Sequence, residues 1–166
     1  TFSLAMQIAQ EMGILNQGDL VVQTAGTLTG ISGSTDLIKV GLVRKIVSRG
    51  ISIGEIGVTG KARIIKNNLD MSLICPGEIL FVPEELMKNI PLSKNIAGIV
   101  TNQNVNDVYA LFNKNNKKIS TICNLENMDN HQISNGDLIT LQLNEGVIYM
   151  GQIEDDDDAI DKYKYV

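Results

Sequence analysis

A run of thirteen residues between two short apolar segments has the composition of an anion-binding loop. Residues 23–35 are almost all Gly, Thr, Ser or Ala, with only Leu28 and Ile31 apolar. The apolar segments at 20–22 and 37–40 predict two strands joined by this loop. Hydroxyls and free backbone N–H groups in such a loop can cradle a phosphate or another anion. We therefore predict that an anion binds to the following residues: Thr27, Thr29, Gly30, Ser32, Gly33, Ser34 and Thr35.

Other residue types that could do chemistry stand alone in the sequence. Cys75 and Cys123 each lie in an apolar run without CxxC or Cys/His spacing, which predicts two buried, reduced thiols. His131, the one histidine, lies in a polar turn, where a solvent-exposed ring is expected. The acids at 154–158 predict a solvated tail, with weak divalent-cation binding as the alternative. We expect no metal site and no cofactor within this chain.

Composition limits the classes of partner. The chain has 166 residues, of which 43% are apolar and 20% charged, which suits one or two small globular domains. A net charge of -5 argues against nucleic-acid binding, and no apolar run approaches the length that spans a bilayer. Because Thr1 is not a natural start, we expect a piece of a longer protein or a processed product.

The apolar pattern predicts the elements around the loop and a different region after it. Leu4, Ile8 and Met12 recur at helical spacing and predict a helix over 2–12 that Gly13 ends. Strands are expected at 20–22 and 37–47, with a hinge at 48–50. In the region that follows, apolar runs predict helices at 83–87 and 104–112 and strands at 61–65, 79–82, 96–100, 119–123, 138–141 and 147–149. Val105, Val108 and Phe112 share one face of the predicted helix at 104–112, and the two asparagines at 67–68 predict a turn.

The loop and its flanking strands resemble part of a known family. The string GDLVVQTAGTLTGISGSTDLIKV, residues 18–40, is similar to the last hairpin in the C-terminal domain of pyruvate kinase. In that family the loop belongs to an allosteric sugar-phosphate site, so the resemblance implies a sugar-phosphate effector. The members regulated by sugar bisphosphates carry Arg and Trp in this loop, and residues 26–36 have neither. The resemblance therefore favours a monophosphate effector, or none.

Residues 50–151 resemble the mobile, or swivelling, domain of phosphoenolpyruvate-utilising enzymes, which some pyruvate kinases carry directly after that hairpin. The similar segments include VTGKA at 58–62 and AGIVT at 97–101. Active mobile domains hold a phosphate-carrying histidine in a segment GG-(L)-TSHAA at a helix start. Aligned without gaps, the histidine position is Tyr109 and the two glycines are Asn104 and Val105. The resemblance thus implies a domain without its phosphohistidine, and no catalytic residue in this chain.

These observations predict an α/β chain of two domains. They are a partial pyruvate kinase C-terminal domain at 1–48, made of a helix plus a β-hairpin, and a swivelling β/β/α domain at 49–153, followed by an acidic tail at 154–166. The implied function is a regulatory or structural C-terminal segment of a pyruvate kinase. Two alternatives stay open: a phosphohistidine-type carrier domain and a non-catalytic binding module.

The resemblance also implies partners and a compartment. The parent enzyme would transfer a phosphoryl group from phosphoenolpyruvate to ADP, using Mg and K that bind outside this chain. Its partners would be the remainder of the parent chain and the other subunits of a homo-tetramer, with no nucleic acid and no membrane. We expect a cytoplasmic protein, and the Asn-, Lys- and Ile-rich sequence leaves a plastid-type organelle as the alternative.

Overall fold

The chain forms two compact units whose sequence boundary lies between Lys45 and Ile46. The computed structural model describes residues 2–26, 35–129 and 132–153. Among the described residues, no helix is long and apolar enough to cross a membrane.

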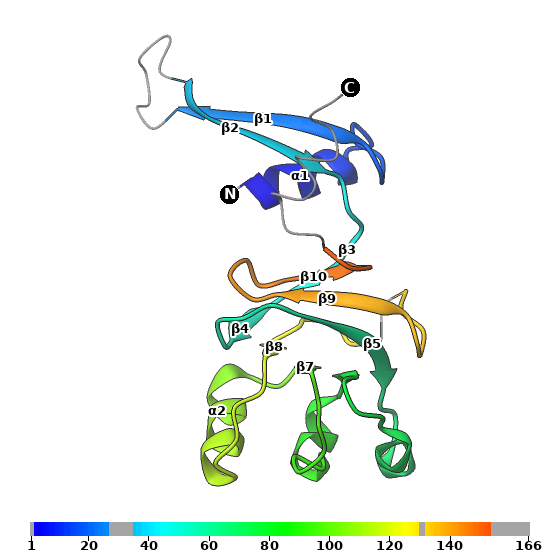
Figure 1. The fold of residues 1–166 in the computed structure, drawn as a ribbon. Helices are drawn as coiled ribbons and strands as arrows, with labels where there is room; N and C mark the ends of the chain where they lie inside the picture. The colour runs from blue at the N-terminus through cyan, green and yellow to red at the C-terminus, as the bar shows by residue number, and fades with distance from the viewer. Residues whose placement is uncertain (1, 27–34, 130–131, 154–166) are drawn as a thin grey trace. The chain divides into compact units, whose positions relative to one another are not determined.

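The first unit holds one helix and one antiparallel hairpin (Figure 1). Helix α1 (Phe2–Glu11) ends before Gly13, whose positive φ of 70° suits a glycine stop, as the sequence predicts. Strand β1 (Leu20–Gly26) pairs with β2 (Thr35–Leu42), with Leu20 opposite Leu42 and Val22 opposite Val40. The predicted strand over 37–47 is therefore shorter, because β2 ends at Leu42 and residues 43–45 have no regular structure.

Large apolar side chains remain exposed on this unit. On the hairpin, Val22 is 64% exposed and Ile38 is 68% exposed. The same holds for side chains on α1, after it and at the start of β1: Leu4, Ile8, Met12, Ile14 and Leu20. A two-stranded hairpin with one helix has no second layer to cover both faces, and so small a unit buries little apolar surface.

A peptide of residues 1–48 should therefore not fold cooperatively by itself. Its circular dichroism should change gradually with temperature at micromolar concentration, because apolar side chains that stay exposed do not stabilise the folded state. A fragment of residues 46–153, run as the control, should show one sigmoidal transition. A sigmoidal melt of the 1–48 peptide would contradict this prediction.

The second unit is an α/β fold built on a nearly closed, mixed sheet of eight strands. The sheet order is β3-β10-β9-β5-β6-β7-β8-β4. The two edge strands in this order, β3 and β4, are consecutive in sequence and are separated only by Gly50. The two edges of the sheet therefore lie next to each other in the chain. The strands are β3 (Ile46–Arg49), β4 (Ile51–Ile53), β5 (Val58–Ile64), β6 (Ile79–Phe81), β7 (Gly98–Val100), β8 (Thr121–Cys123), β9 (Leu138–Gln142) and β10 (Val147–Met150).

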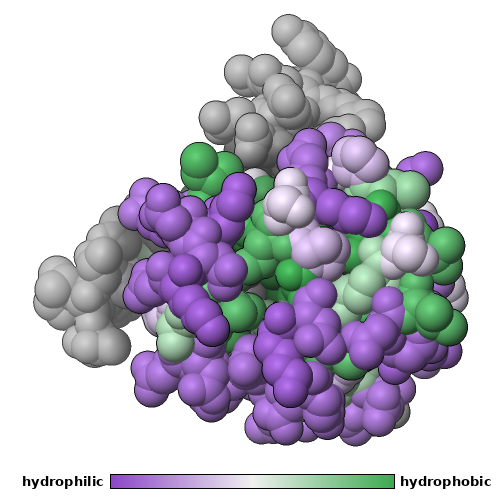
Figure 2. Space-filling view, turned by 90° about the horizontal axis from the view of Figure 1, so that it is seen from below, coloured by the Kyte–Doolittle hydropathy of each residue, from purple (hydrophilic) through white to green (hydrophobic). Residues whose placement is uncertain are grey.

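Four consecutive strands, β5 to β8, run parallel and are joined by helical crossovers. The crossovers contain η1 (Asn68–Leu73), η2 (Glu84–Asn89) and α2 (Val105–Lys114). Figure 1 shows α2 and the two short helices below the parallel strands, with β9 and β10 above them. On the face that carries these helices, hydrophilic side chains cover most of the surface, and apolar side chains show only in smaller areas (Figure 2).

Side chains of the parallel strands alternate between the two faces of the sheet and form two apolar clusters. Successive side chains of a strand point to opposite faces. In β6 and the residue after it, Leu80 and Val82 pack with Met87, Val108 and Phe112 from the helices. Ile79 and Phe81 instead pack with Ile122 and with residues of β9 and β10. Burial on both faces explains why these strands are short continuous apolar runs.

Two local predictions are wrong for a physical reason. The expected hinge at 48–50 lies inside the sheet, because Ser48 and Arg49 belong to β3 and the Gly50 N–H donates to the Gly146 carbonyl at 2.9 Å. The expected turn at 67–68 starts η1, which the sequence prediction missed. The Asn67 side chain accepts from the backbone N–H groups of Leu69 and Asp70, and the Asp70 carboxylate accepts from Asn67 N–H. This reciprocal capping stabilises a short 3-10 helix there.

Candidate functional site

The carboxyl ends of the parallel strands form the natural place for a site in the second unit. In open α/β sheets, ligands bind beside the carboxyl ends of the strands. Here that edge is built from the segments that follow β5, β6, β7 and β8. The start of α2 lies directly after β7, and a pocket lies beside the ends of β5 and β6.

The loop between β7 and α2 is held by side-chain and backbone hydrogen bonds. Thr101 is fully buried, and its hydroxyl oxygen accepts from the Gln103 N–H at 3.1 Å. The carbonyls of Thr101 and Gln103 accept from the N–H groups of Leu125 and Asn124, just after β8. These bonds fix the start of α2 relative to both strands.

The N-terminus of α2 is capped by the chain's own polar groups. The Asn104 side-chain oxygen accepts from the Asp107 backbone N–H at 3.0 Å. The Asn104 amide also donates to the Asp107 carboxylate at 2.5 Å. A helix N-terminus attracts anions through its free N–H groups and its dipole. At this one an internal carboxylate already lies in the first turn, so an incoming phosphate would meet negative charge.

Tyr109 is the fifth residue of α2 and lies toward solvent. Its side chain is 46% exposed, whereas Val108 and Phe112 form the buried face of the helix. The structure thus places the predicted phosphohistidine position on an exposed helix surface, with a phenol in place of an imidazole. A phenol is not the imidazole nucleophile that phosphohistidine chemistry requires.

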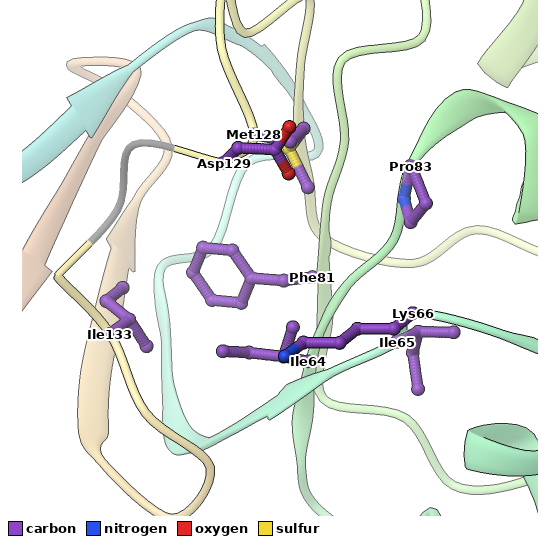
Figure 3. Close-up of a pocket in the computed structure, with 8 residues that line it drawn as sticks. All are labelled: Ile64, Ile65, Lys66, Phe81, Pro83, Met128, Asp129 and Ile133. Atoms are coloured by element: carbon purple, nitrogen blue, oxygen red, sulfur yellow. The ribbon is translucent and has the colours of Figure 1, made fainter.

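A pocket of about 410 Å³ lies at the same edge of the sheet (Figure 3). Its walls come from the ends of β5 and β6, which pair through Ile64 and Phe81, and from the connection between β8 and β9. Six lining side chains are apolar and two are charged. They are Ile64, Ile65, Phe81, Pro83, Met128 and Ile133, with Lys66 and Asp129.

The one buried acidic side chain among the described residues lies before β6, outside this pocket. Glu78 accepts two hydrogen bonds from the Arg63 guanidinium, at 3.1 and 2.7 Å, and one from the Cys75 N–H at 2.8 Å. The Arg63 hydrogen bond is the main cause that lowers the pKa of Glu78, against the opposing effect of burial. The same pairing raises the pKa of Arg63. The Arg63–Glu78 pair therefore joins β5 to the turn before β6, and its role is structural.

The sequence-predicted site residues have different outcomes. Thr35 is the first residue of β2. The other members of the predicted anion loop lie outside the described residues, as do His131 and the acidic tail: Thr27, Thr29, Gly30, Ser32, Gly33 and Ser34. The anion site therefore stays a prediction.

The two cysteines differ from one another. Cys123 is buried as predicted, and burial raises the pKa of its thiol. Cys75 is exposed, so its predicted burial is wrong. Cys75 lies in the turn between η1 and β6, and its backbone N–H donates to the Glu78 carboxylate. Within the described parts of the chain, no three His, Cys, Asp or Glu side chains gather closely enough to hold a metal ion.

Sequence reasoning missed the pocket. Its residues come from three segments far apart in the chain, and only the parallel pairing of β5 with β6 brings two of them together. A weak signal was present, since a charged or rigid residue follows each apolar strand end, at Lys66 and Pro83. Such a pattern is common at strand ends and does not by itself predict a pocket.

The sequence of this chain is similar to segments of known proteins, a relationship that the geometry of the site does not reveal. Pyruvate kinase 2 of Synechocystis sp. is 36% identical over 153 residues, which cover 92% of this chain and 26% of that protein. Pyruvate kinases of Staphylococcus saprophyticus and Lactobacillus delbrueckii subsp. bulgaricus are 30% and 25% identical over similar lengths. This chain is homologous to a segment of pyruvate kinases. It spans about a quarter of the length of the curated relatives it matches. No protein-family profile matches the chain.

Solved structures give a weaker likeness. The microcin C7 self-immunity protein MccF, in complex with glutamyl sulfamoyl guanosine, aligns with 89% of this chain and 56% of its own, at a TM-score of 0.42 and 13% identity. The inactive mutant of MccF aligns at the same TM-score and 14% identity. At these TM-scores the likeness carries no argument about function.

Proposed function

We propose that this chain is a non-catalytic, regulatory or structural C-terminal segment of a pyruvate kinase. Residues 1–45 would form part of the C-terminal domain, and residues 46–153 a swivelling domain without a phosphohistidine. The parent enzyme would transfer a phosphoryl group from phosphoenolpyruvate to ADP with Mg and K. Support comes from the pyruvate kinase relatives, which match nearly the whole chain with about a quarter of their own length.

The arrangement at the start of α2 is the single observation that carries the non-catalytic part of this proposal. A phosphohistidine carrier needs an imidazole at the helix start and free N–H groups that stabilise the phosphate. In this chain Asn104 and Asp107 cap the helix, and Tyr109 occupies the aligned histidine position on its exposed side. This chain therefore lacks the imidazole that the carrier alternative requires, and the Asp107 N–H is already bonded to the Asn104 side chain.

The proposal assigns partners to the surfaces of the first unit. The remainder of the parent chain would cover the exposed apolar side chains of α1 and the hairpin, including Val22 and Ile38. The parent would assemble as a homo-tetramer in the cytoplasm or in a plastid-type organelle. A sugar phosphate would bind the hydroxyl-rich loop between β1 and β2. Its donors would be the hydroxyls of Thr29, Ser32, Ser34 and Thr35 and the backbone N–H groups of Gly30 and Gly33.

The full-length protein that contains this segment should transfer phosphoryl groups to ADP without labelling this segment. Incubated with labelled phosphoenolpyruvate and digested, it should yield no acid-labile label in residues 51–151, because no imidazole is available at position 109. Tyr109→Phe should leave kcat within about two-fold of the original, since the phenol hydroxyl would take no part in the reaction.

A mobile domain that carries the phosphohistidine segment, treated identically within its own enzyme, is the positive control for label recovery. Acid-labile label within residues 51–151 would favour the carrier alternative. A large fall in kcat on Tyr109→Phe, with the fold intact, would also contradict the proposal. A full-length protein without any transfer from phosphoenolpyruvate to ADP would reject the parent assignment itself.

A further inference from the structure

We propose that the pocket at the ends of β5 and β6 binds a small zwitterion with an apolar body, of which an α-amino acid with a branched or aromatic side chain is the simplest. The inference concerns the second unit alone and does not depend on the activity of a parent enzyme. It rests on the position of the pocket, its apolar lining and the two charged groups that border it (Figure 3).

The pocket has the location and size of a small-molecule site. It opens beside the carboxyl ends of two parallel strands, the edge at which parallel strands of open α/β sheets bind ligands. Its volume of about 410 Å³ lies at the small end of the range of roughly 300–1,000 Å³ seen for ligand pockets. A molecule of the size of a single amino acid suits this space better than a nucleotide.

The inner walls are apolar. Phe81 and Ile133 are 3% and 7% exposed, so these walls belong to the core of the unit. Figure 3 shows the Phe81 ring between Ile64 on one side and Met128 on the other, with Ile133 facing it. An aliphatic or aromatic side chain placed here would be removed from water and would contact an aromatic ring, both of which favour binding.

Two charged side chains of opposite sign border this apolar space. In the view of Figure 3, Lys66 extends along one side of the Phe81 ring and Asp129 lies on the other. Both residues are exposed. Neither the Lys66 ammonium nor the Asp129 carboxylate forms a hydrogen bond or ion pair with another described residue. Each has one local backbone hydrogen bond: the Lys66 N–H donates to the Asp70 carboxylate at 2.7 Å, and the Asp129 N–H donates to the Asn127 side chain at 2.9 Å.

This pair of charges selects the ligand class. A carboxylate near Lys66 and an ammonium near Asp129 would each gain an ion pair, whereas a ligand with one charge leaves one side unmatched and meets a like charge. A phosphate ester is disfavoured because Lys66 is the one cation among the lining residues. Complementary charges at the border of an apolar space therefore point to a zwitterion. Because the two charges of an α-amino acid share one carbon, that carbon would lie between Lys66 and Asp129, and its side chain would occupy the apolar space.

The test uses the complete 166-residue chain and the methyl signals of the pocket. L-leucine and L-phenylalanine should shift the methyl resonances of Ile64, Met128 and Ile133 in a saturable way, with millimolar affinity. Two analogues of leucine separate its charges: 4-methylpentanoate lacks the ammonium, and 3-methylbutylamine lacks the carboxylate. Each analogue should bind about five-fold more weakly than leucine, because each leaves one charged residue unmatched.

Charge-removing variants then assign each contact. Lys66→Met should weaken leucine and 4-methylpentanoate about five-fold and leave 3-methylbutylamine unweakened, while Asp129→Asn should show the reverse selectivity. Lys117→Met, an exposed lysine after α2, is the matched control and should change nothing. All three sites are on the surface, so the variants should fold. Absence of saturable shifts at about 20 mM of either amino acid would overturn the proposal. An affinity for leucine that is unchanged in both Lys66→Met and Asp129→Asn would also overturn the proposal.

Discussion

Gly50→Ala should lower the free energy of unfolding of the second unit by about 3 kcal/mol. A methyl group at this position would lie 2.5 Å from the carbonyl oxygen of Cys123 and 2.7 Å from a methyl carbon of Ile122. Both distances are far below van der Waals contact, and one neighbour is backbone that cannot rotate away. Relief would require moving Gly50 and the adjacent β4 away from β8, at the place where the sheet nearly closes.

The measurement is urea unfolding of the 166-residue chain, followed by far-ultraviolet circular dichroism. The matched control is Gly41→Ala, because that glycine lies in β2 and a methyl group there has no neighbour within 4 Å. The control should be neutral or slightly stabilising, since alanine reduces the conformational freedom of the unfolded chain. An unchanged midpoint for Gly50→Ala would mean that Gly50 does not lie against Ile122 and Cys123 of β8 as described.

Arg63→Met should destabilise the second unit by about 2–3 kcal/mol at neutral pH. The variant leaves the Glu78 carboxylate largely buried, at 9% side-chain exposure, with only the Cys75 N–H as a donor. The loss should be smaller than for a fully dry ion pair, because the Arg63 side chain is 21% exposed and water can replace part of the interaction. Lys117→Met, which removes an exposed cation without an acidic partner in the described residues, is the control.

The pH dependence of this effect has a definite sign. In the folded protein the pKa of Glu78 lies below its ordinary value of 4.5, mainly because Arg63 donates to the carboxylate. The pair therefore contributes its full stability above pH 4.5, and the contribution is lost as the pH falls through the folded pKa. Urea midpoints of the original chain and of Arg63→Met should converge in acid. A difference that stays constant from pH 7 to pH 3 would show that the Glu78 charge is not involved.

Local pattern predicted most of the elements correctly. Apolar spacing placed α1 and α2 within a residue or two, and it identified Val108 and Phe112 on the buried face of α2. Continuous apolar runs identified β6, β7 and β8. These elements are set by side chains near one another in sequence, so their periodicity is visible before any tertiary contact is known. The resemblance to mobile domains also aligned Tyr109 with their phosphohistidine, and this assignment stays a prediction.

The sequence alone therefore determined the local elements, the relation of the chain to pyruvate kinases and the absence of an imidazole on α2. Only the tertiary structure decided that Gly50 lies within a nearly closed sheet, that Cys75 is exposed and that Glu78 pairs with Arg63. It alone assembled the pocket from strand ends and a distant connection. The physical reason is that these features depend on strand order and register, which bring together residues far apart in the chain. Local propensity determines how a segment is shaped, whereas the burial of both sheet faces determines which segments become neighbours.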